Sequence, residues 1–213
     1  MNSSYDLLMR LPFLGWVLLC ATVQVAGLTH YPKSMDSIYV IHVAMRLSTI
    51  GFMLLLAAAV IFRTRPSAKA NGLEPRISAL AGTFLIYGIA VFPRLDLSLS
   101  LEIISTVLTM IGNVGAVVAL SQLGRSFSIM AETRELVTTG PYRFVRHPLY
   151  LAEEIAIVGI FIQFVSGWTA LLLAVQIGFQ LRRIHNEELV LAERFPEYAV
   201  YSQTTARLIP GMY

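Results

Sequence analysis

The sequence predicts an all-α integral membrane protein, and its composition and its apolar segments both support that class. The chain has 213 residues, of which 56% are hydrophobic and 14% are charged. Soluble domains are about 45–50% apolar and about 25% charged, so a lipid bilayer suits this composition better than water. Long apolar runs recur along the chain, which predicts one bundle of five to six transmembrane helices in a single domain, residues 1–213.

Six apolar runs are candidates for these helices, since a span needs about 20 residues. In chain order they are Leu11–Leu28, Ile38–Phe62, Ile77–Phe92, Leu97–Leu120, Leu149–Val165 and Trp168–Leu181. The first run is longer than the core of a secretory signal, so we expect a retained anchor. The last run is short. The break at Ser166-Gly167 predicts a tight turn, so the last two runs should form a helical hairpin.

The basic residues predict how the helices are oriented. If the spans alternate from a cytoplasmic N-terminus, only Lys33 and Arg94 fall in loops on the far side, and Arg46 lies inside a span. Cytoplasmic loops carry an excess of Lys and Arg, so both termini and the loop before Leu149 should be cytoplasmic. If the source is a bacterium, this implies the inner membrane. For Arg46 and Glu102, the ionisable groups in earlier spans, we expect a structural role, either reaching to the membrane surface or pairing with a neighbouring helix.

Charge and cysteine content exclude some functions. The net charge of +3 is small for a nucleic-acid-binding protein and is explained by loop arginines, so we expect no nucleic-acid partner. Cys20 is the only cysteine, which excludes an internal disulfide and a multi-cysteine metal site. We predict no metal site and no obligate protein partner.

Polar residues gather in the last third of the chain. Gln176, Gln180, Arg183 and Glu187 are spaced by four, three and four residues, so they share one face of a helix. We expect this helix to continue out of the membrane through "RRIHNEELVLAERF". The same spacing makes Arg183 and Glu187 a possible surface ion pair worth only a few tenths of a kcal/mol.

The stretch "GPYRFVRHPLY", residues 140–150, precedes the hairpin. A residue before proline is pushed out of helical geometry, so Gly140 and His147 each mark a break, and Pro148 suits the first turn of a helix. The start of that helix favours anionic groups. An interfacial belt of aromatic and basic residues would also suit the stretch, but a belt requires neither the histidine nor two spaced prolines.

Two segments together resemble the isoprenylcysteine carboxyl methyltransferase family and related membrane phospholipid methyltransferases. They are "LVTTGPYRFVRHPLYLAEE" (136–154) and "RIHNEELVLAERFPEYAVYSQTTARLIP" (183–210). The resemblance covers about the last 90 residues of the chain, and residues 1–122 match only as four membrane helices. It implies that residues 123–213 form the catalytic region and bind S-adenosylmethionine on the cytoplasmic side.

The resemblance also implies roles for individual residues. Arg183 would face the acceptor as the catalytic residue. The residues implied to bind the cofactor are Arg134, Glu135, Leu136, Val137, Tyr142, His147, Pro148, Leu149, Tyr150 and Glu187. The chemistry of S-adenosylmethionine agrees with these roles. Glu187 can pair with the ammonium group of this cofactor, and tyrosine rings can stack on its adenine. His185-Asn186 departs from the acidic residues usual at that place in the eukaryotic pattern, which bears on the acceptor.

The acceptor is expected to be a lipophilic small molecule or a membrane lipid. Carboxylate O-methylation of an isoprenylcysteine-like substrate is favoured, and a carboxylate is already ionised at pH 7, so Arg183 would only position it. N-methylation of a phospholipid or other amine is the alternative, and it needs a base such as His147 or Glu154. A sterol-reductase-like NADPH enzyme and a non-catalytic membrane protein are weaker alternatives.

Overall fold

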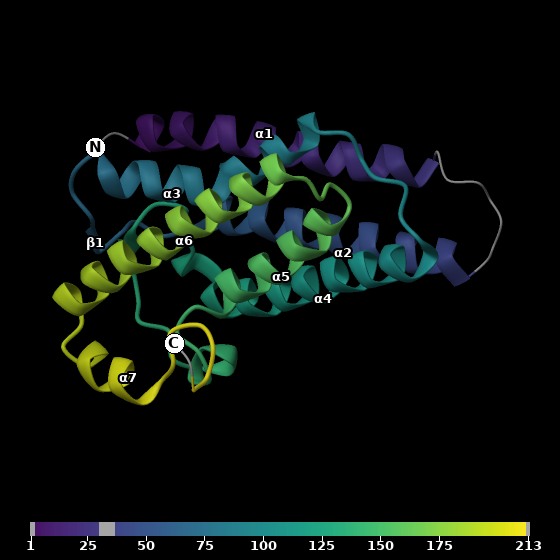
Figure 1. Ribbon diagram of the computed structural model, residues 1–213. Coiled ribbons are helices and arrows are strands. Elements are labelled where there is room, and N and C mark those ends of the chain that lie inside the picture. The colour runs from purple at the N-terminus through teal and green to yellow at the C-terminus, as the bar shows by residue number, and fades with distance from the viewer. Residues whose placement is uncertain (1–2, 30–36, 212–213) are drawn as a thin grey trace.

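A computed structural model describes residues 3–29 and 37–211 of the chain (Figure 1). Lys33, used above to predict orientation, lies outside the described residues. The long helices are α1 (Ser3–Thr29), α2 (Ser37–Phe62), α4 (Leu99–Leu123) and α6 (Gly167–Arg194). The shorter helices are α3 (Glu74–Phe84), α5 (Pro148–Ile162) and α7 (Tyr198–Thr204), and the 3₁₀ segments are η1 (Leu85–Val91), η2 (Gly124–Ser126) and η3 (Gly140–Arg143). Two short strands, β1 (Ala68–Lys69) and β2 (Glu132–Thr133), pair antiparallel.

Three of these helices are long and apolar enough to cross a membrane: Arg10–Leu28, Ile38–Phe62 and Leu99–Ser126. Large apolar side chains remain exposed along them, for example Leu18, Leu54 and Ile111. Such surfaces are rare on soluble monomers and suit contact with lipid. The remaining predicted spans are helical but differ in form. The third changes to 3₁₀ geometry at Leu85, α5 has 15 residues and so measures about 22 Å, and α6 carries charges in its second half.

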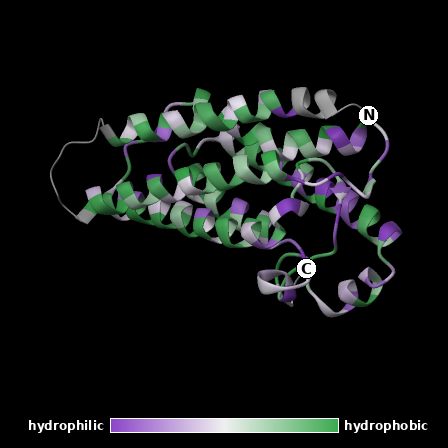
Figure 2. Ribbon diagram, turned by 180° about the vertical axis from the view of Figure 1, so that it is seen from behind, coloured by the Kyte–Doolittle hydropathy of each residue, from purple (hydrophilic) through white to green (hydrophobic). Residues whose placement is uncertain are grey.

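The helices form a bundle in which α1 packs on α2, α2 on α4 and α4 on α5, while α6 packs on α3 and η1 (Figure 1). Hydrophilic residues concentrate at the end of the bundle that carries the start of α1, the strands and the C-terminal region (Figure 2). The described residues nearest to the two termini also lie at this end (Figure 1). The orientation predicted from the basic residues likewise puts both termini on one side of the membrane. This end holds the candidate site.

The predicted hairpin is confirmed. α5 ends at Ile162 and α6 begins at Gly167, with Ser166 as its N-cap: Thr169 N donates to Ser166 Oγ and Ser166 N donates to Thr169 Oγ1. Gly167 is the first helical residue and does not have a positive φ, so the serine cap, rather than glycine, sets the turn. As predicted, α6 continues past the apolar run to Arg194.

Small residues bring α4 and α5 close together. A Cβ added to Gly112 would lie 2.4 Å from Ala156 N, and one added to Gly159 would lie 2.5 Å from Thr109 Oγ1. Closely packed helices in membranes use small residues in this way. Because α5 begins at the predicted site, this interface fixes the position of the site relative to the bundle.

Arg46 and Glu102 both contact neighbouring helices, which is one of the two structural roles expected for them. Arg46 Nη1 on α2 donates to Gln24 Oε1 on α1 at 3.1 Å. Glu102 Oε1 at the start of α4 lies 3.3 Å from His42 Nε2 on α2. Both contacts join neighbouring helices of the bundle.

Candidate functional site: a polar pocket at the end of the bundle

A pocket with about 750 Å³ of empty space, including its opening to solvent, lies where α5, α6, α7 and the segment 123–147 meet. Sites for small molecules fall in the range of about 300–1,000 Å³. Its lining residues are Leu123, Ser126, Phe127, Ser128, Glu132, Thr133, Glu135, Leu136, Val137, Tyr142, Arg146, His147, Leu149, Tyr150, Glu187, Leu191, Tyr198 and Tyr201. Aromatic and carboxylate groups therefore share one cavity.

Eight of the residues predicted to bind the cofactor line this pocket: Glu135, Leu136, Val137, Tyr142, His147, Leu149, Tyr150 and Glu187. Three predicted site residues do not line it. Arg134 is buried, and its Nε donates to Thr64 O at 2.6 Å in the loop between α2 and α3. Pro148 is the first residue of α5. Arg183 lies one turn before Glu187 on α6, and its guanidinium sits over the Tyr150 ring, 4.6 Å from the centroid.

In the stretch "GPYRFVRHPLY" the backbone leaves helical geometry at both predicted residues, Gly140 and His147. Gly140 has φ of +59° and begins η3, and a Cβ there would lie 3.0 Å from the Gln122 side chain. His147 has extended φ of −126° and precedes Pro148, which starts α5. These two breaks place Tyr142 and His147 on the pocket wall, both buried.

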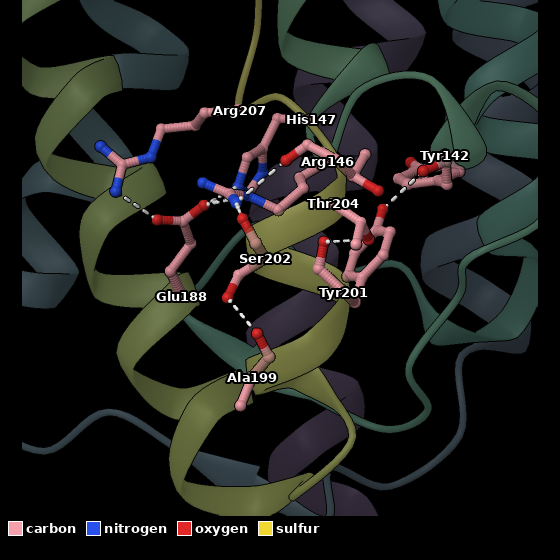
Figure 3. Close-up of polar contacts among 10 residues, drawn as sticks. Tyr142, Arg146, His147, Glu188, Ala199, Tyr201, Ser202, Thr204 and Arg207 are labelled. Carbon is pink, nitrogen blue, oxygen red and sulfur yellow. Dashed lines mark hydrogen bonds and ion pairs between the residues drawn. The ribbon is translucent and has the colours of Figure 1, made fainter.

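A charged network around Glu188 includes two residues of the pocket lining, Arg146 and His147 (Figure 3). Glu188 Oε1 lies 2.9 Å from Arg146 Nε and 3.2 Å from His147 Nε2, and its Oε2 lies 2.5 Å from Arg207 Nη2. A carboxylate only accepts hydrogen bonds, so His147 Nε2 carries the proton. The His147 ring also stacks on Tyr150, with 5.6 Å between centroids. Glu188 thus fixes the orientation of two pocket residues.

The C-terminal tail is attached to the same loop. Arg146 N donates to Ala206 O at 2.8 Å, His147 N donates to Arg207 O at 3.1 Å, and the Arg146 guanidinium donates to Ser202 O. Tyr201 OH donates to Tyr142 O at 2.6 Å (Figure 3). These bonds hold α7, which carries Tyr198 and Tyr201, over the pocket.

Tyr142 presents a neutral phenol to the cavity. Burial, followed by the nearby charge of Glu187, raises the pKa of Tyr142 well above its usual value. Within the described part of the chain its buried hydroxyl has no hydrogen-bond partner. A buried polar group without a partner is costly, so this hydroxyl is available to a ligand or a water molecule.

Glu188→Gln should lower the free energy of unfolding by up to about 3 kcal/mol at pH 7. Burial alone would raise the pKa of the Glu188 carboxyl, but hydrogen bonds from His147 and Arg207 outweigh it and lower the pKa to about 2. The folded pKa is below the unfolded value of about 4.3, so the stabilisation is complete above about pH 5 and is lost as the pH falls toward 2.

Thermal unfolding of the detergent-solubilised protein at pH 7 and pH 3 tests this prediction. The difference in stability between wild type and Glu188→Gln should be smaller at pH 3 than at pH 7. A difference in stability that does not depend on pH would contradict the prediction. Glu193→Gln, at an exposed position of the same helix, is the matched control and should change stability little.

Sequence reasoning did not find the central role of Glu188 or the role of the loop before α3. Residues 67–70 of that loop bond to residues 131–133 beside the pocket, through Ser67 N to Thr133 O and Ala70 N to Ala131 O, both at 2.8 Å. Nothing in the loop's composition indicates this pairing. Glu188 could have been suspected, since it adjoins Glu187, but its partners come from segments distant in sequence.

The fold and site together define a class: an all-α protein with candidate membrane spans and a polar pocket at one end of an apolar helical bundle. Residues 104–193 match the isoprenylcysteine carboxyl methyltransferase (ICMT) family. This part of the chain is an ICMT family domain, which confirms the resemblance seen in the sequence.

Two bacterial relatives are similar over 114 residues. They are the nickel-cobalt-cadmium resistance protein NccN of Alcaligenes xylosoxydans xylosoxydans, at 33% identity, and the cobalt-zinc-cadmium resistance protein CzcN of Cupriavidus metallidurans, at 31%. Each match covers 51% of this chain, and 53% of NccN or 52% of CzcN. The chain thus spans about half the length of the curated relatives it matches. Among residues 3–29 and 37–211, no group of three or more His, Cys, Asp and Glu side chains could hold a metal ion.

Proposed function

We propose that the protein is a membrane-embedded methyltransferase that uses S-adenosylmethionine and modifies a lipophilic acceptor. The observation that carries the proposal is that Tyr142 and His147 line one pocket with Glu187, which lies 40 residues beyond His147 in the sequence. The family resemblance assigns all three residues to the cofactor. Had these side chains pointed away from one another, the proposal would have had no site.

The residues of the pocket fit the proposed cofactor. S-adenosylmethionine, when bound, supplies a methyl group on a positively charged sulfur. The Glu187 carboxylate lines the cavity and can accept hydrogen bonds from the cofactor's ammonium group. Tyr142, Tyr198 and Tyr201 offer aromatic faces for its adenine, and the Tyr142 hydroxyl has no partner among the described residues. Transfer then requires mainly that the acceptor be aligned and separated from water.

The position of the pocket at the hydrophilic end of the bundle suggests how the protein lies in the membrane. We propose that α3 with η1, α5 and the apolar half of α6 join the three long helices in the bilayer, giving six segments. The basic loops and the pocket then face the cytoplasm. A lipophilic acceptor would enter from the bilayer beside α5 and α6, where Val158, Leu171 and Val175 are exposed. The water-soluble cofactor would enter from the opposite side.

The relatives' names associate them with resistance to metals, and their catalytic role does not follow from those names. For this chain we propose catalysis on an organic acceptor, because the pocket offers carboxylate, tyrosine and histidine groups that suit S-adenosylmethionine.

Calorimetry of the detergent-purified protein with S-adenosylmethionine tests the proposal. We expect one site with a dissociation constant in the micromolar range, a binding free energy of about −8 kcal/mol. NADPH in place of S-adenosylmethionine should give no heat of binding. Binding of NADPH alone would support the reductase alternative, and binding of neither ligand would contradict the proposed function.

A further inference from the structure

A row of polar side chains continues from the pocket into the apolar bundle, between α5 and α6. Glu154 Oε1 accepts from Gln176 Nε2 at 2.9 Å, and Glu153 Oε2 accepts from Gln180 Nε2 at 3.3 Å. Nearer the pocket, Tyr150 OH donates to Glu187 Oε1. Gln176 and Gln180 are buried, and polar groups at such depth usually have a function.

Three side-chain oxygen atoms in this row have no hydrogen-bond partner within the described part of the chain: Gln180 Oε1, Glu154 Oε2 and Gln176 Oε1. The last two belong to one hydrogen-bonded pair of side chains. The orientation of the Gln176 amide is defined, because its nitrogen donates both to Glu154 Oε1 and to Gly82 O, at 2.9 and 3.1 Å. Its oxygen is therefore left as an acceptor beside Glu154. The missing partner must be a hydrogen-bond donor, since both atoms can only accept when Glu154 is ionised.

The charge of the row points to the same kind of ligand. Glu153, Glu154 and Glu187 supply three carboxyl groups, and Arg183 supplies one guanidinium. That guanidinium has contacts on several sides: Nη1 donates to Thr83 Oγ1 at 2.9 Å, Nε forms an ion pair with Glu187 Oε1 at 3.4 Å but no hydrogen bond, and the guanidinium carbon lies over the Tyr150 ring. An incoming carboxylate would meet an excess of negative charge around this single guanidinium, whereas an ammonium group brings three donors and a positive charge.

We infer that Glu154 and Gln176 form the binding site for the acceptor's headgroup, and that this headgroup is a protonated amine on an apolar chain. The inference rests on the proposed function and names its acceptor class. Glu154 is one helical turn beyond Tyr150 on the same face of α5, so a headgroup held there lies next to the inner wall of the pocket. Glu154 is only partly buried, which leaves the site accessible from the bilayer.

Glu154 would also accept the proton that the acceptor must lose in the reaction. An alkylammonium group must lose a proton before it can attack, because its pKa is near that of lysine, about 10.4. Glu154 Oε2 accepts that proton, and the nitrogen lone pair then forms the N–C bond to the methyl carbon. The S–C bond breaks, and its electron pair stays on sulfur, which becomes a neutral thioether. The product is a methylated ammonium ion, and Glu154 returns its proton to water.

Octylamine and octanoate, which have equal chain length and opposite charge, test the inference on the full-length protein in detergent. In calorimetry without cofactor, octylamine should bind at least about tenfold more tightly than octanoate, and Glu154→Gln should remove that preference. Gln176→Met, which keeps the size of the side chain and removes the amide oxygen, should weaken octylamine binding about tenfold. The exposed Glu193→Gln is the matched control and should bind octylamine as wild type does.

With methyl-labelled S-adenosylmethionine, octylamine should acquire a label that resists base. Glu154→Gln should lower its kcat about 100-fold or more while the Kd for S-adenosylmethionine stays within about twofold. Preferred binding of octanoate, a base-labile ester label, or unchanged octylamine binding and kcat in Glu154→Gln would overturn the inference. If wild type binds octylamine selectively but not S-adenosylmethionine, the proposed function fails while the amine site stands.

Discussion

Glu187→Ala should lower the affinity for S-adenosylmethionine by at least about 100-fold, which is about 2.7 kcal/mol or more. Glu187 lines the pocket from α6 and accepts a hydrogen bond from Tyr150. Removing it would leave the ligand's ammonium group without an anionic partner and the Arg183 guanidinium without its neighbour at 3.4 Å. An interaction between buried, hydrogen-bonded charges loses about 2–5 kcal/mol when one partner is truncated.

Calorimetry measures this effect directly, with thermal unfolding as a check on the fold. Glu193→Ala removes a carboxylate from an exposed position 6 residues further along α6 and should leave affinity within about twofold. Glu187→Gln keeps an acceptor for Tyr150 but removes the charge, so its affinity should fall between wild type and Glu187→Ala. Retained tight binding in Glu187→Ala would refute the assignment of this residue to the cofactor.

Gly112→Ala should destabilise the protein by more than about 3 kcal/mol, even though it adds a single carbon atom. That carbon would lie 2.4 Å from Ala156 N and 2.6 Å from Ala152 O, so it would collide with the backbone of α5. Overpacking a core costs about 1–3 kcal/mol when side chains can adjust, and more is expected here because a helix must move. Since the first turn of α5 carries the pocket residues Leu149 and Tyr150 and directly follows His147, cofactor affinity should also fall.

Gly178→Ala is the matched control for this helix interface. Gly178 is an exposed residue of α6, and a Cβ there would meet no atom within 4 Å. The substitution should stabilise the protein by about 0.5–1 kcal/mol, because glycine is a poor helix former. Equal melting temperatures for Gly112→Ala and wild type in detergent would show that α4 and α5 do not pack as closely as described.

Local sequence signals predicted much of the site. The prolines at 141 and 148 marked the breaks that place Tyr142 and His147, and the spacing of Gln176, Gln180, Arg183 and Glu187 predicted a common face of α6. The structure confirms that face, since Gln176, Gln180 and Arg183 are all buried and Glu187 lines the pocket. Such signals are readable because backbone geometry and helical periodicity depend on residues close together in the chain.

Other features could not be read in the same way. The resemblance assigned Arg134 to the cofactor, yet its side chain binds the loop between α2 and α3, and that role in cofactor binding stays a prediction. The partners of Glu188, namely Arg146, His147 and Arg207, come from three separate segments. Which of two adjacent glutamates meets them depends on the rotation of α6 against α5, and no local pattern sets that rotation.

By itself, the sequence determined the all-α apolar character of the chain, the hairpin of α5 and α6, and the helix face shared by Gln176, Gln180, Arg183 and Glu187. Only the tertiary structure decided that Glu187 faces the pocket while Glu188 ties the C-terminal tail to His147. It also decided that Glu154 and Gln176 meet inside the bundle with unpartnered oxygens. The physical reason is that periodicity fixes which side chains share a helix face, whereas close packing at residues such as Gly112 and Gly159 fixes which faces meet.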